Sequence, residues 1–192
     1  AKVVGFEPQE DCCDKAKSNL SVYNLIGKFK AKNIALSDSI GEADFYKSPE
    51  HYLSTMSTEF IEESKKERFK NSHWGSKTTV ETSTLDQQIS EHGQPKYIKI
   101  DVEGFEYNVL KGLTKPVKYI SIEFTPELYH NTEKCLDYLC DLNNGKCLYN
   151  YVYRENDHYL FDEWQDIKNI KEYLSNVKDF KYEFGDIFIK SI

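Results

Sequence analysis

Short apolar runs that alternate with helical patterns are the feature that most constrains the fold of this 192-residue chain. Runs at 2–6, 97–100 and 117–124 are each followed by a segment with apolar side chains at helical spacing. Such alternation favours a mainly parallel sheet covered by helices. Two extended segments, 147–153 and 158–161, have the pattern of a hairpin and predict an antiparallel strand at one edge. The sequence therefore predicts an α/β fold with a Rossmann-like sheet.

The remaining segments follow the same pattern, with one exception. Alternating side chains predict a strand over 29–36 and a shorter one over 43–46. A capping signal at 82–86 starts a helix that should end at Gly93, and a helix over 166–174 leads into a last strand over 182–189. Residues 47–79 are polar and irregular, so we predict an insertion on the acceptor side, either a functional loop or a poorly ordered segment.

Length and charge limit the class of protein. The chain fits a single domain over 1–192. Its net charge is −7 and its basic residues form no long block, so we expect no nucleic acid partner. The absence of a membrane-length apolar run and of a secretion signal predicts a cytoplasmic protein without a membrane partner. The sequence does not indicate an oligomeric state.

The cysteines have no spacing typical of a zinc site. Their number is odd, and we interpret them as free reduced thiols: Cys12, Cys13, Cys135, Cys140 and Cys147. Asp11 and Asp14 flank the first pair and oppose thiolate formation there. Oxygen ligands from Asp101 and Glu123 suit a cation, but acids alone are weak support, so we predict no metal site.

Acidic residues at strand ends are the first candidates for a binding site. In open α/β sheets ligands bind beyond the carboxyl ends of the strands. Four acids stand at such positions: Glu7, Asp38, Asp101 and Glu123. A carboxylate such as Glu7 can accept hydrogen bonds from both ribose hydroxyls of an adenosine. The alternative is an acid that stabilises the following helix N-terminus without binding a ligand.

The segment IKIDVEGFE, residues 98–106, is the most informative part of the sequence. Asp101 and Glu103 end a buried strand, and Gly104 allows a tight turn or a close approach to a ligand. Clustered carboxylates raise one another's proton affinity, which suits a general base or the binding of a cationic sulfonium. The alternative is helix capping by Glu103 and Glu106.

Longer stretches of the sequence resemble one family. The run TLDQQISEHGQPKYIKIDVEGFEYNVLKGL at 84–113, followed by ISIEF at 120–124, resembles the central signature of FkbM family methyltransferases. In that signature a TLD-initiated helix leads to a K-I-D-V-E-G-x-E strand and turn. FEP at 6–8, ALSD at 35–38 and GDIFI at 185–189 also resemble the family and occur in its order.

The resemblance implies a class I methyltransferase sheet of seven strands with a reversed last strand, and S-adenosylmethionine as cofactor. It implies cofactor contacts from Phe6, Glu7, Pro8, Ser37, Asp38 and Asp101. Glu7 would hold the ribose hydroxyls, and Ser37 or Asp38 would reach the adenine amino edge. Asp101, with Glu103, would face the methionine end and act in catalysis. The three acids Glu7, Asp38 and Asp101 should therefore converge on one crevice.

Candidate acceptor contacts rest on weaker patterns. His73 stands beside Trp74 in the irregular stretch, and Glu123 and His130 follow or end a strand. An ordinary solvated surface is the alternative for each of them. The acceptor we expect is a small molecule with a hydroxyl group, such as a sugar or another metabolite.

The sequence departs from the family at its start. Family members carry a glycine-rich G-x-N-x-G-like turn after a central first strand, upstream of the FEP strand. This chain begins at Ala1 with a strand-like segment at 2–6, so that strand-turn unit is lacking. Because a parallel sheet without its central strand would leave open edges in its core, we interpret the domain as N-terminally incomplete.

Methyl transfer from S-adenosylmethionine to a hydroxyl oxygen is the function that these observations favour. One alternative is a non-catalytic interaction module, for which Glu7→Ala and Asp101→Ala would leave function in the host unchanged. Another is a nicotinamide-dependent oxidoreductase, against which the absence of a G-x-G-x-x-G turn counts. Competition between S-adenosylmethionine and a nicotinamide cofactor would separate the methyltransferase from the oxidoreductase.

Overall fold

A four-stranded sheet forms the C-terminal half of the protein. The computed structural model describes residues 1–66, 69–154, 156–180 and 183–192. The strands follow the order β6-β7-β9-β8, with β6 at Tyr97–Ile100, β7 at Tyr119–Phe124, β8 at Cys147–Tyr153 and β9 at Gly185–Ser191. β6 pairs with β7 in parallel, whereas β9 is antiparallel to both of its neighbours. The predicted α/β fold with parallel and antiparallel strands is confirmed.

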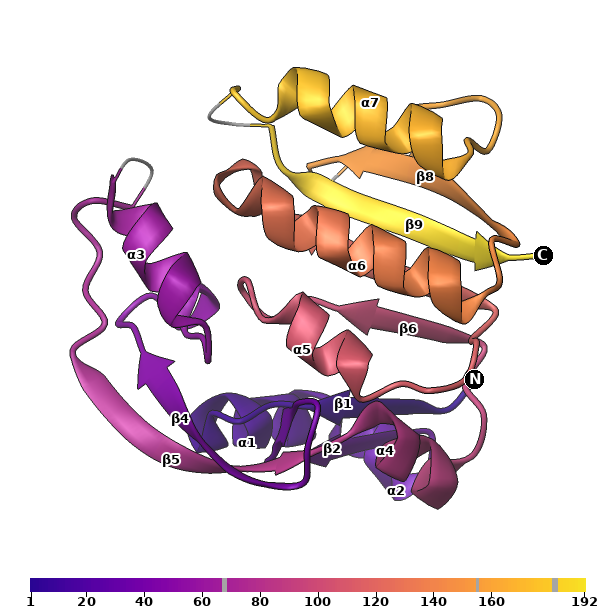
Figure 1. The fold of residues 1–192 in the computed structure, drawn as a ribbon. Helices are drawn as coiled ribbons and strands as arrows, with labels where there is room; N and C mark the ends of the chain where they lie inside the picture. Colours follow the sequence, from indigo (N-terminus) through magenta and orange to yellow (C-terminus); the bar gives the residue numbers. More distant parts are fainter. Residues whose placement is uncertain (67–68, 155, 181–182) are drawn as a thin grey trace.

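One face of this sheet carries the main core. The helices α5 (Glu106–Lys111), α6 (Tyr129–Leu142) and α7 (Ile167–Val177) lie along it (Figure 1). Alternate strand residues such as Ile100, Ile122 and Ile187 are buried against them. The intervening residues Lys99, Glu123 and Asp186 point to the opposite face, because successive side chains of a strand alternate. One face of the strands is therefore apolar, whereas the other combines charged side chains with aromatic ones such as Tyr97 and Phe188.

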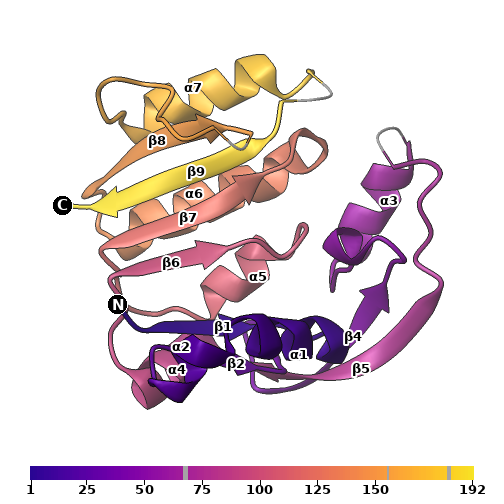
Figure 2. The ribbon, with the colours of Figure 1, turned by 180° about the vertical axis from the view of Figure 1, so that it is seen from behind.

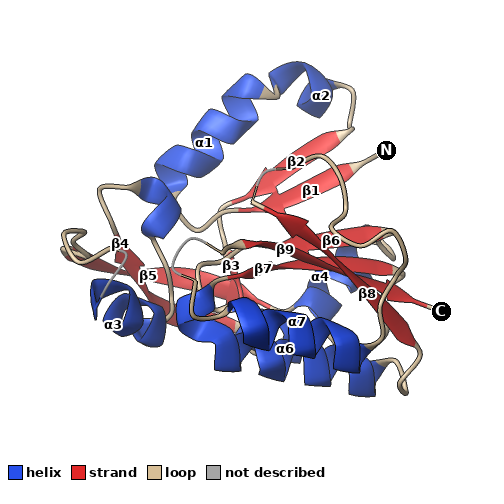
Figure 3. Ribbon diagram, turned by 90° about the horizontal axis from the view of Figure 1, so that it is seen from above, coloured by secondary structure: helices blue, strands red, loops and turns tan. Residues whose placement is uncertain are grey.

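A two-stranded sheet at the N-terminus lies beside this core. β1 (Val3–Phe6) pairs in parallel with β2 (Phe29–Lys32), and α1 (Glu10–Asn19) and α2 (Ser21–Leu25) connect them. β1 runs alongside β6 in Figures 1 and 2, yet no ladder joins the two strands within the described residues. Figure 3 shows α1 and α2 on one side of the strands and α3, α4, α6 and α7 on the other.

The middle of the chain forms a third sheet. Its order is β3-β5-β4, with β3 at Ala35–Leu36, β4 at Gly41–Lys47 and β5 at Ser76–Ser83. The 3-10 helix η1 (His51–Leu53) and the helix α3 (Thr58–Lys66) lie between β4 and β5. Leu53, Phe60 and Leu128 form a second small core here, with Trp74 packed against it. A further 3-10 helix, η2 (Pro126–Leu128), follows β7.

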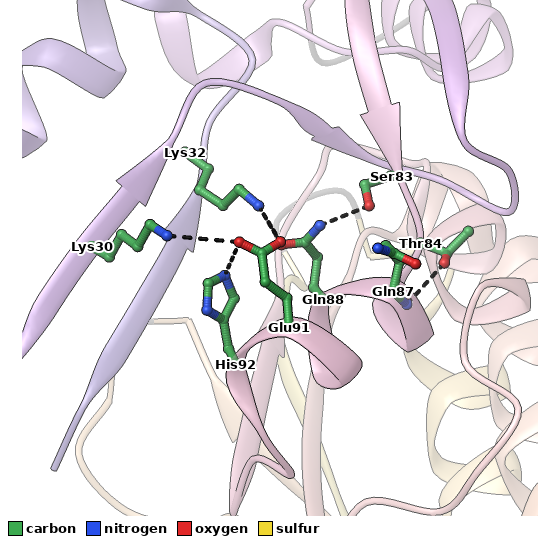
Figure 4. Close-up of polar contacts among 8 residues, drawn as sticks. All are labelled: Lys30, Lys32, Ser83, Thr84, Gln87, Gln88, Glu91 and His92. Carbon is green, nitrogen blue, oxygen red and sulfur yellow. Dashed lines mark hydrogen bonds and ion pairs between the residues drawn. The ribbon is translucent and has the colours of Figure 1, made fainter.

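Helix α4 (Leu85–His92) joins the middle sheet to β6 and is tied to β2 by polar side chains (Figure 4). Thr84 caps the helix by accepting from the Gln87 N–H, and Gly93 ends it, which confirms the predicted limits. Lys32 Nζ lies 2.9 Å from Gln88 Oε1 and 2.8 Å from Glu91 Oε2. These bonds join the N-terminal sheet to α4 through charged and polar side chains.

One prediction about the strands is confirmed and two are wrong. β8, the first segment of the predicted hairpin, is the antiparallel edge strand of the four-stranded sheet, and the reversed last strand β9 lies beside it inside the sheet. Residues 156–161 form no strand, because Asn150 holds the backbone N–H and C=O of Phe161 while β8 pairs along its length with β9. The predicted strand over 29–36 is split, because the Asn33 side chain donates to the carbonyls of Glu7 and Pro8 and turns the chain. Residue 182, the predicted start of the last strand, lies outside the described residues.

The stretch 47–79 is more regular than its sequence suggests. It contains η1, α3 and the first residues of β5. The order comes from burial: Leu53 and Phe60 are almost fully buried and anchor the stretch on Leu128. No helix in the described part of the chain is long and apolar enough to cross a membrane.

Candidate functional site

A cavity of about 730 Å³ lies where the ends of β1, β3, β6 and β7 meet η1 and α3. Its wall includes six of the residues that the sequence singles out: Phe6, Glu7, Pro8, Asp101, Glu103 and Glu123. Apolar residues such as Leu36, Phe60 and Phe105 line other parts of the wall. A cavity of this size falls in the range of roughly 300–1,000 Å³ that small-molecule sites occupy.

Glu7 stands at the end of β1, on one side of this cavity. Its Oε1 accepts a hydrogen bond of 2.7 Å from the Gln9 N–H, which fixes the carboxylate beside the turn into α1. Burial raises the pKa of Glu7, and that hydrogen bond opposes the rise. A partly buried carboxylate in a concave wall is suited to accept hydrogen bonds from ligand hydroxyls.

Three carboxylates meet on the other side of the cavity and form what we call the acid cluster: Asp101, Glu103 and Glu123. An oxygen from each lies within 4.8 Å of the others. The parallel register that pairs Ile100 with Ile122 brings Asp101 beside Glu123. Oxygen donors at this spacing suit either a hard divalent cation or the positive charge of an organic ligand.

Charge and burial act on the acid cluster together. Burial, followed by the nearby Asp101 and Glu106, raises the pKa of Glu123 to about 8. Its Oε2 is buried and has no hydrogen-bond partner among the described residues. Lys99 Nζ lies 3.3 Å from Asp101 Oδ2 and 2.9 Å from Asp186 Oδ2, so one cation partly balances the acids. Glu123 therefore holds a proton at neutral pH while a neighbouring carboxylate is paired with Lys99.

The turn after β6 places Glu103 in the cluster. Glu103 and Gly104 have φ angles of 52° and 84°, both in the left-handed region. Glu106 is buried and accepts from the Val102 and Gly104 N–H groups at 3.2 and 3.1 Å. Burial raises the pKa of Glu106 to about 7. Glu106 therefore holds the turn that precedes α5, whose N-cap Phe105 makes no side-chain cap, and the Glu103 carboxylate lies in the acid cluster.

Gly104 is required by its surroundings as well as by its φ angle. A Cβ atom at this position would overlap the side chains of Leu128 and Phe60. The carbonyl of Gly104 accepts from Asn131 at 3.2 Å, and the Glu103 carbonyl accepts from Thr55 at 2.7 Å. The tight turn that carries the acid cluster is therefore packed directly against α3 and η2.

Four of the candidate residues lie outside the wall of the cavity as the described residues define it: Ser37, Asp38, His73 and His130. Asp38 Oδ2 is 2.6 Å from Lys111 Nζ, and this hydrogen bond lowers the pKa of Asp38. Ser37 donates to Asp38 Oδ1, and His130 Nε2 lies 2.6 Å from Glu59 Oε1. Of the three acids expected to converge, the cavity unites Glu7 with Asp101 but not with Asp38.

A second hollow of about 540 Å³ adjoins the first and is lined by His73 together with Gln9, Asp11 and His51. His51 and Gln9 line both spaces. Three of the lining residues belong to no motif that marks a site in the sequence: His51, Gln9 and Lys99. Lys99 was detectable, because it stands two positions before Asp101 on the same face of β6. His51 was not, since only the fold brings η1 to the start of α1.

Comparison with known proteins identifies the family. A family model described as the methyltransferase FkbM domain matches residues 1–182. No match to the chain was found among curated proteins or among solved structures. The segment that carries the resemblance, 84–113, is also the segment that places Asp101 and Glu103 in the cavity. Because the family model spans nearly the whole sequence, this chain belongs to the FkbM methyltransferase family and is a methyltransferase domain.

Proposed function

We propose that the protein transfers a methyl group from S-adenosylmethionine to a hydroxyl oxygen of a small acceptor, a sugar or another metabolite. The observation that carries the proposal is the pairing of Glu7 with the acid cluster across one cavity. Family membership supplies the reaction class, and the lining residues supply the choice of donor.

The residues of the cavity fit the donor chemically. Glu7, with Phe6 and Pro8 beside it, offers a carboxylate for the two ribose hydroxyls and an apolar surface for the adenosine. The acid cluster offers negative charge for the sulfonium. Ser37 and Asp38 receive no role here, because Asp38 is already paired with Lys111.

S-adenosylmethionine, when bound, supplies a methyl group that is already activated by its sulfonium. The protein then contributes alignment, because holding an acceptor oxygen in line with the methyl group removes most of the entropic cost. Asp101 or Glu103 would accept the proton of the acceptor hydroxyl as the new oxygen–carbon bond forms and the methyl–sulfur bond breaks, with its electron pair leaving on sulfur. Glu123 keeps its own proton at neutral pH and therefore does not act as the base.

Calorimetry on the protein expressed in full from its gene tests the proposal. S-adenosylmethionine and its demethylated product should both bind, and Glu7→Ala should weaken both by about 10- to 100-fold, as expected for a lost charged hydrogen bond. Glu42→Ala is the matched control, because Glu42 is an exposed glutamate on β4. Failure of both compounds to bind rejects the donor, and displacement by a nicotinamide cofactor would favour an oxidoreductase.

A further inference from the structure

We propose that Asp11, Cys12 and His51 form a zinc site, with a carboxylate oxygen, a thiolate sulfur and an imidazole nitrogen as ligands. We call these three residues the mixed-donor cluster. None of them has a role in the proposed methyl transfer, so the zinc site does not rest on that function and is tested separately from it.

The fold brings these three residues together from two separate elements. Asp11 and Cys12 lie in the first turn of α1, and His51 begins η1. Their donor atoms all lie within 4.8 Å of one another, and His51 Nε2 is 3.8 Å from Asp11 Oδ2. Ligand atoms of a tetrahedral zinc site lie roughly 3.3–3.8 Å apart, given zinc–ligand bonds of about 2.0–2.3 Å. The cluster is therefore already close to ligand geometry.

The orientation of the His51 ring is set by Gln9. His51 Nδ1 lies 3.2 Å from Gln9 Oε1, and Gln9 Nε2 donates to the His51 carbonyl at 3.2 Å. Because the amide oxygen faces the ring, Nδ1 carries the proton and Nε2 presents its lone pair toward Asp11. Gln9 is 5% exposed, so this orientation is held by a buried group. Histidines that bind metals are oriented by such a hydrogen bond on the second ring nitrogen.

The donor atoms select the type of metal ion. Thiolate, imidazole and carboxylate together suit zinc, whereas magnesium and calcium prefer oxygen ligands alone. Zinc displaces the proton of the Cys12 thiol, which leaves to solvent, and a water completes four ligands. Asp11 and His51 also line the second hollow, which gives the ion and its water access from solvent. The bound ion would tie the start of α1 to η1.

Zinc titration of chelator-treated protein by calorimetry, with Co²⁺ as a spectroscopic probe, tests this site. The wild type should bind one zinc per chain, and the cobalt form should show a thiolate charge-transfer band. Cys12→Ser should abolish that band and weaken zinc binding by about 100-fold or more, because a direct ligand is lost. Asp11→Asn should weaken binding without removing the band, and it serves as a second variant if Cys12→Ser fails to fold.

Two matched controls come from the same chain. Cys140→Ser removes a thiol that is also partly exposed, and Asp14→Asn removes an acid from the same helix. Both should bind zinc and cobalt like the wild type. The proposal is overturned if the wild type binds no zinc, if Cys12→Ser binds it unchanged, or if the charge-transfer band disappears in Cys140→Ser. If Asp101→Asn loses zinc binding while Cys12→Ser keeps it, the ion binds at the acid cluster, and the proposal is overturned as well.

Discussion

The acid cluster and the mixed-donor cluster lie on one continuous concave surface, but they differ in the atoms they present. The acid cluster offers only carboxylate oxygens, and burial, followed by repulsion from Asp101, keeps a proton on Glu123. The mixed-donor cluster offers three different donor atoms, of which only one is a carboxylate oxygen. Oxygen donors close to Lys99 suit proton transfer and a cationic ligand, whereas sulfur and nitrogen donors suit a transition metal.

Gln9 connects the two regions. Its backbone N–H donates to Glu7 on the side of the cavity, and its side chain holds His51 on the side of the hollow. Donor chemistry therefore separates two neighbouring groups of titratable residues even though one residue contacts both.

The largest expected effect is on the acid cluster. Asp101→Asn should lower the rate of methyl transfer by about 10²- to 10⁴-fold, because an amide cannot accept the proton of the acceptor hydroxyl. Steady-state assays with the donor in excess measure the change. Asp44→Asn is the control, since Asp44 is exposed, pairs with Lys77 and does not line the cavity. Equal rates for Asp101→Asn and the wild type would remove Asp101 from the reaction.

Gly104→Ala should have the next largest effect, now on stability. The new Cβ would overlap Leu128 and Phe60 in a left-handed backbone conformation, at a cost of about 2 to 4 kcal/mol in the free energy of unfolding. Gly75→Ala should change that free energy by less than about 0.5 kcal/mol, because its Cβ would meet no atom. Urea titrations of the two variants compare the values, and equal midpoints would show that the turn is not tightly packed.

The proton on Glu123 predicts a dependence of stability on pH. Its pKa is about 8 in the folded protein against 4.5 for the free group, so its contribution to stability is full below pH 4.5 and is lost as pH rises through 8. Between pH 5 and pH 8.5 the free energy of unfolding should fall by about 4 kcal/mol less in Glu123→Gln than in the wild type. Parallel curves for the two proteins contradict the assignment, and Glu42→Gln provides the exposed control.

The smallest expected effect concerns the residue that connects the two regions. Gln9→Ala removes the amide that orients His51 and should weaken zinc binding by about 10-fold. The hydrogen bond from the backbone N–H of residue 9 to the Glu7 carboxylate remains, so the affinity for S-adenosylmethionine should fall by less than this factor. Calorimetry with each ligand gives both values, and Gln87→Ala on the exposed surface of α4 is the control. If Gln9→Ala loses more affinity for S-adenosylmethionine than for zinc, the side chain of Gln9 serves the cavity more than the mixed-donor cluster.

The sequence by itself determined the family, the α/β class and the residues of the acid cluster. Strand β6, the turn at Gly104 and helix α5 occupy consecutive positions, so local patterns predict them together. The same holds for Glu7 at the end of β1 and for the limits of α4. Contacts between residues close in sequence leave a readable pattern, because spacing along a strand or helix fixes which side chains share a face.

The tertiary structure alone decided the rest. It placed β9 inside the sheet and buried Phe60 in the second small core. It also paired Asp38 with Lys111 and placed His51 beside Cys12. Each of these depends on contacts between segments far apart in the chain, for which neither periodicity nor composition carries a signal. Burial then set the proton affinities of Glu106 and Glu123, since the loss of water around a carboxylate is known only once the chain has packed.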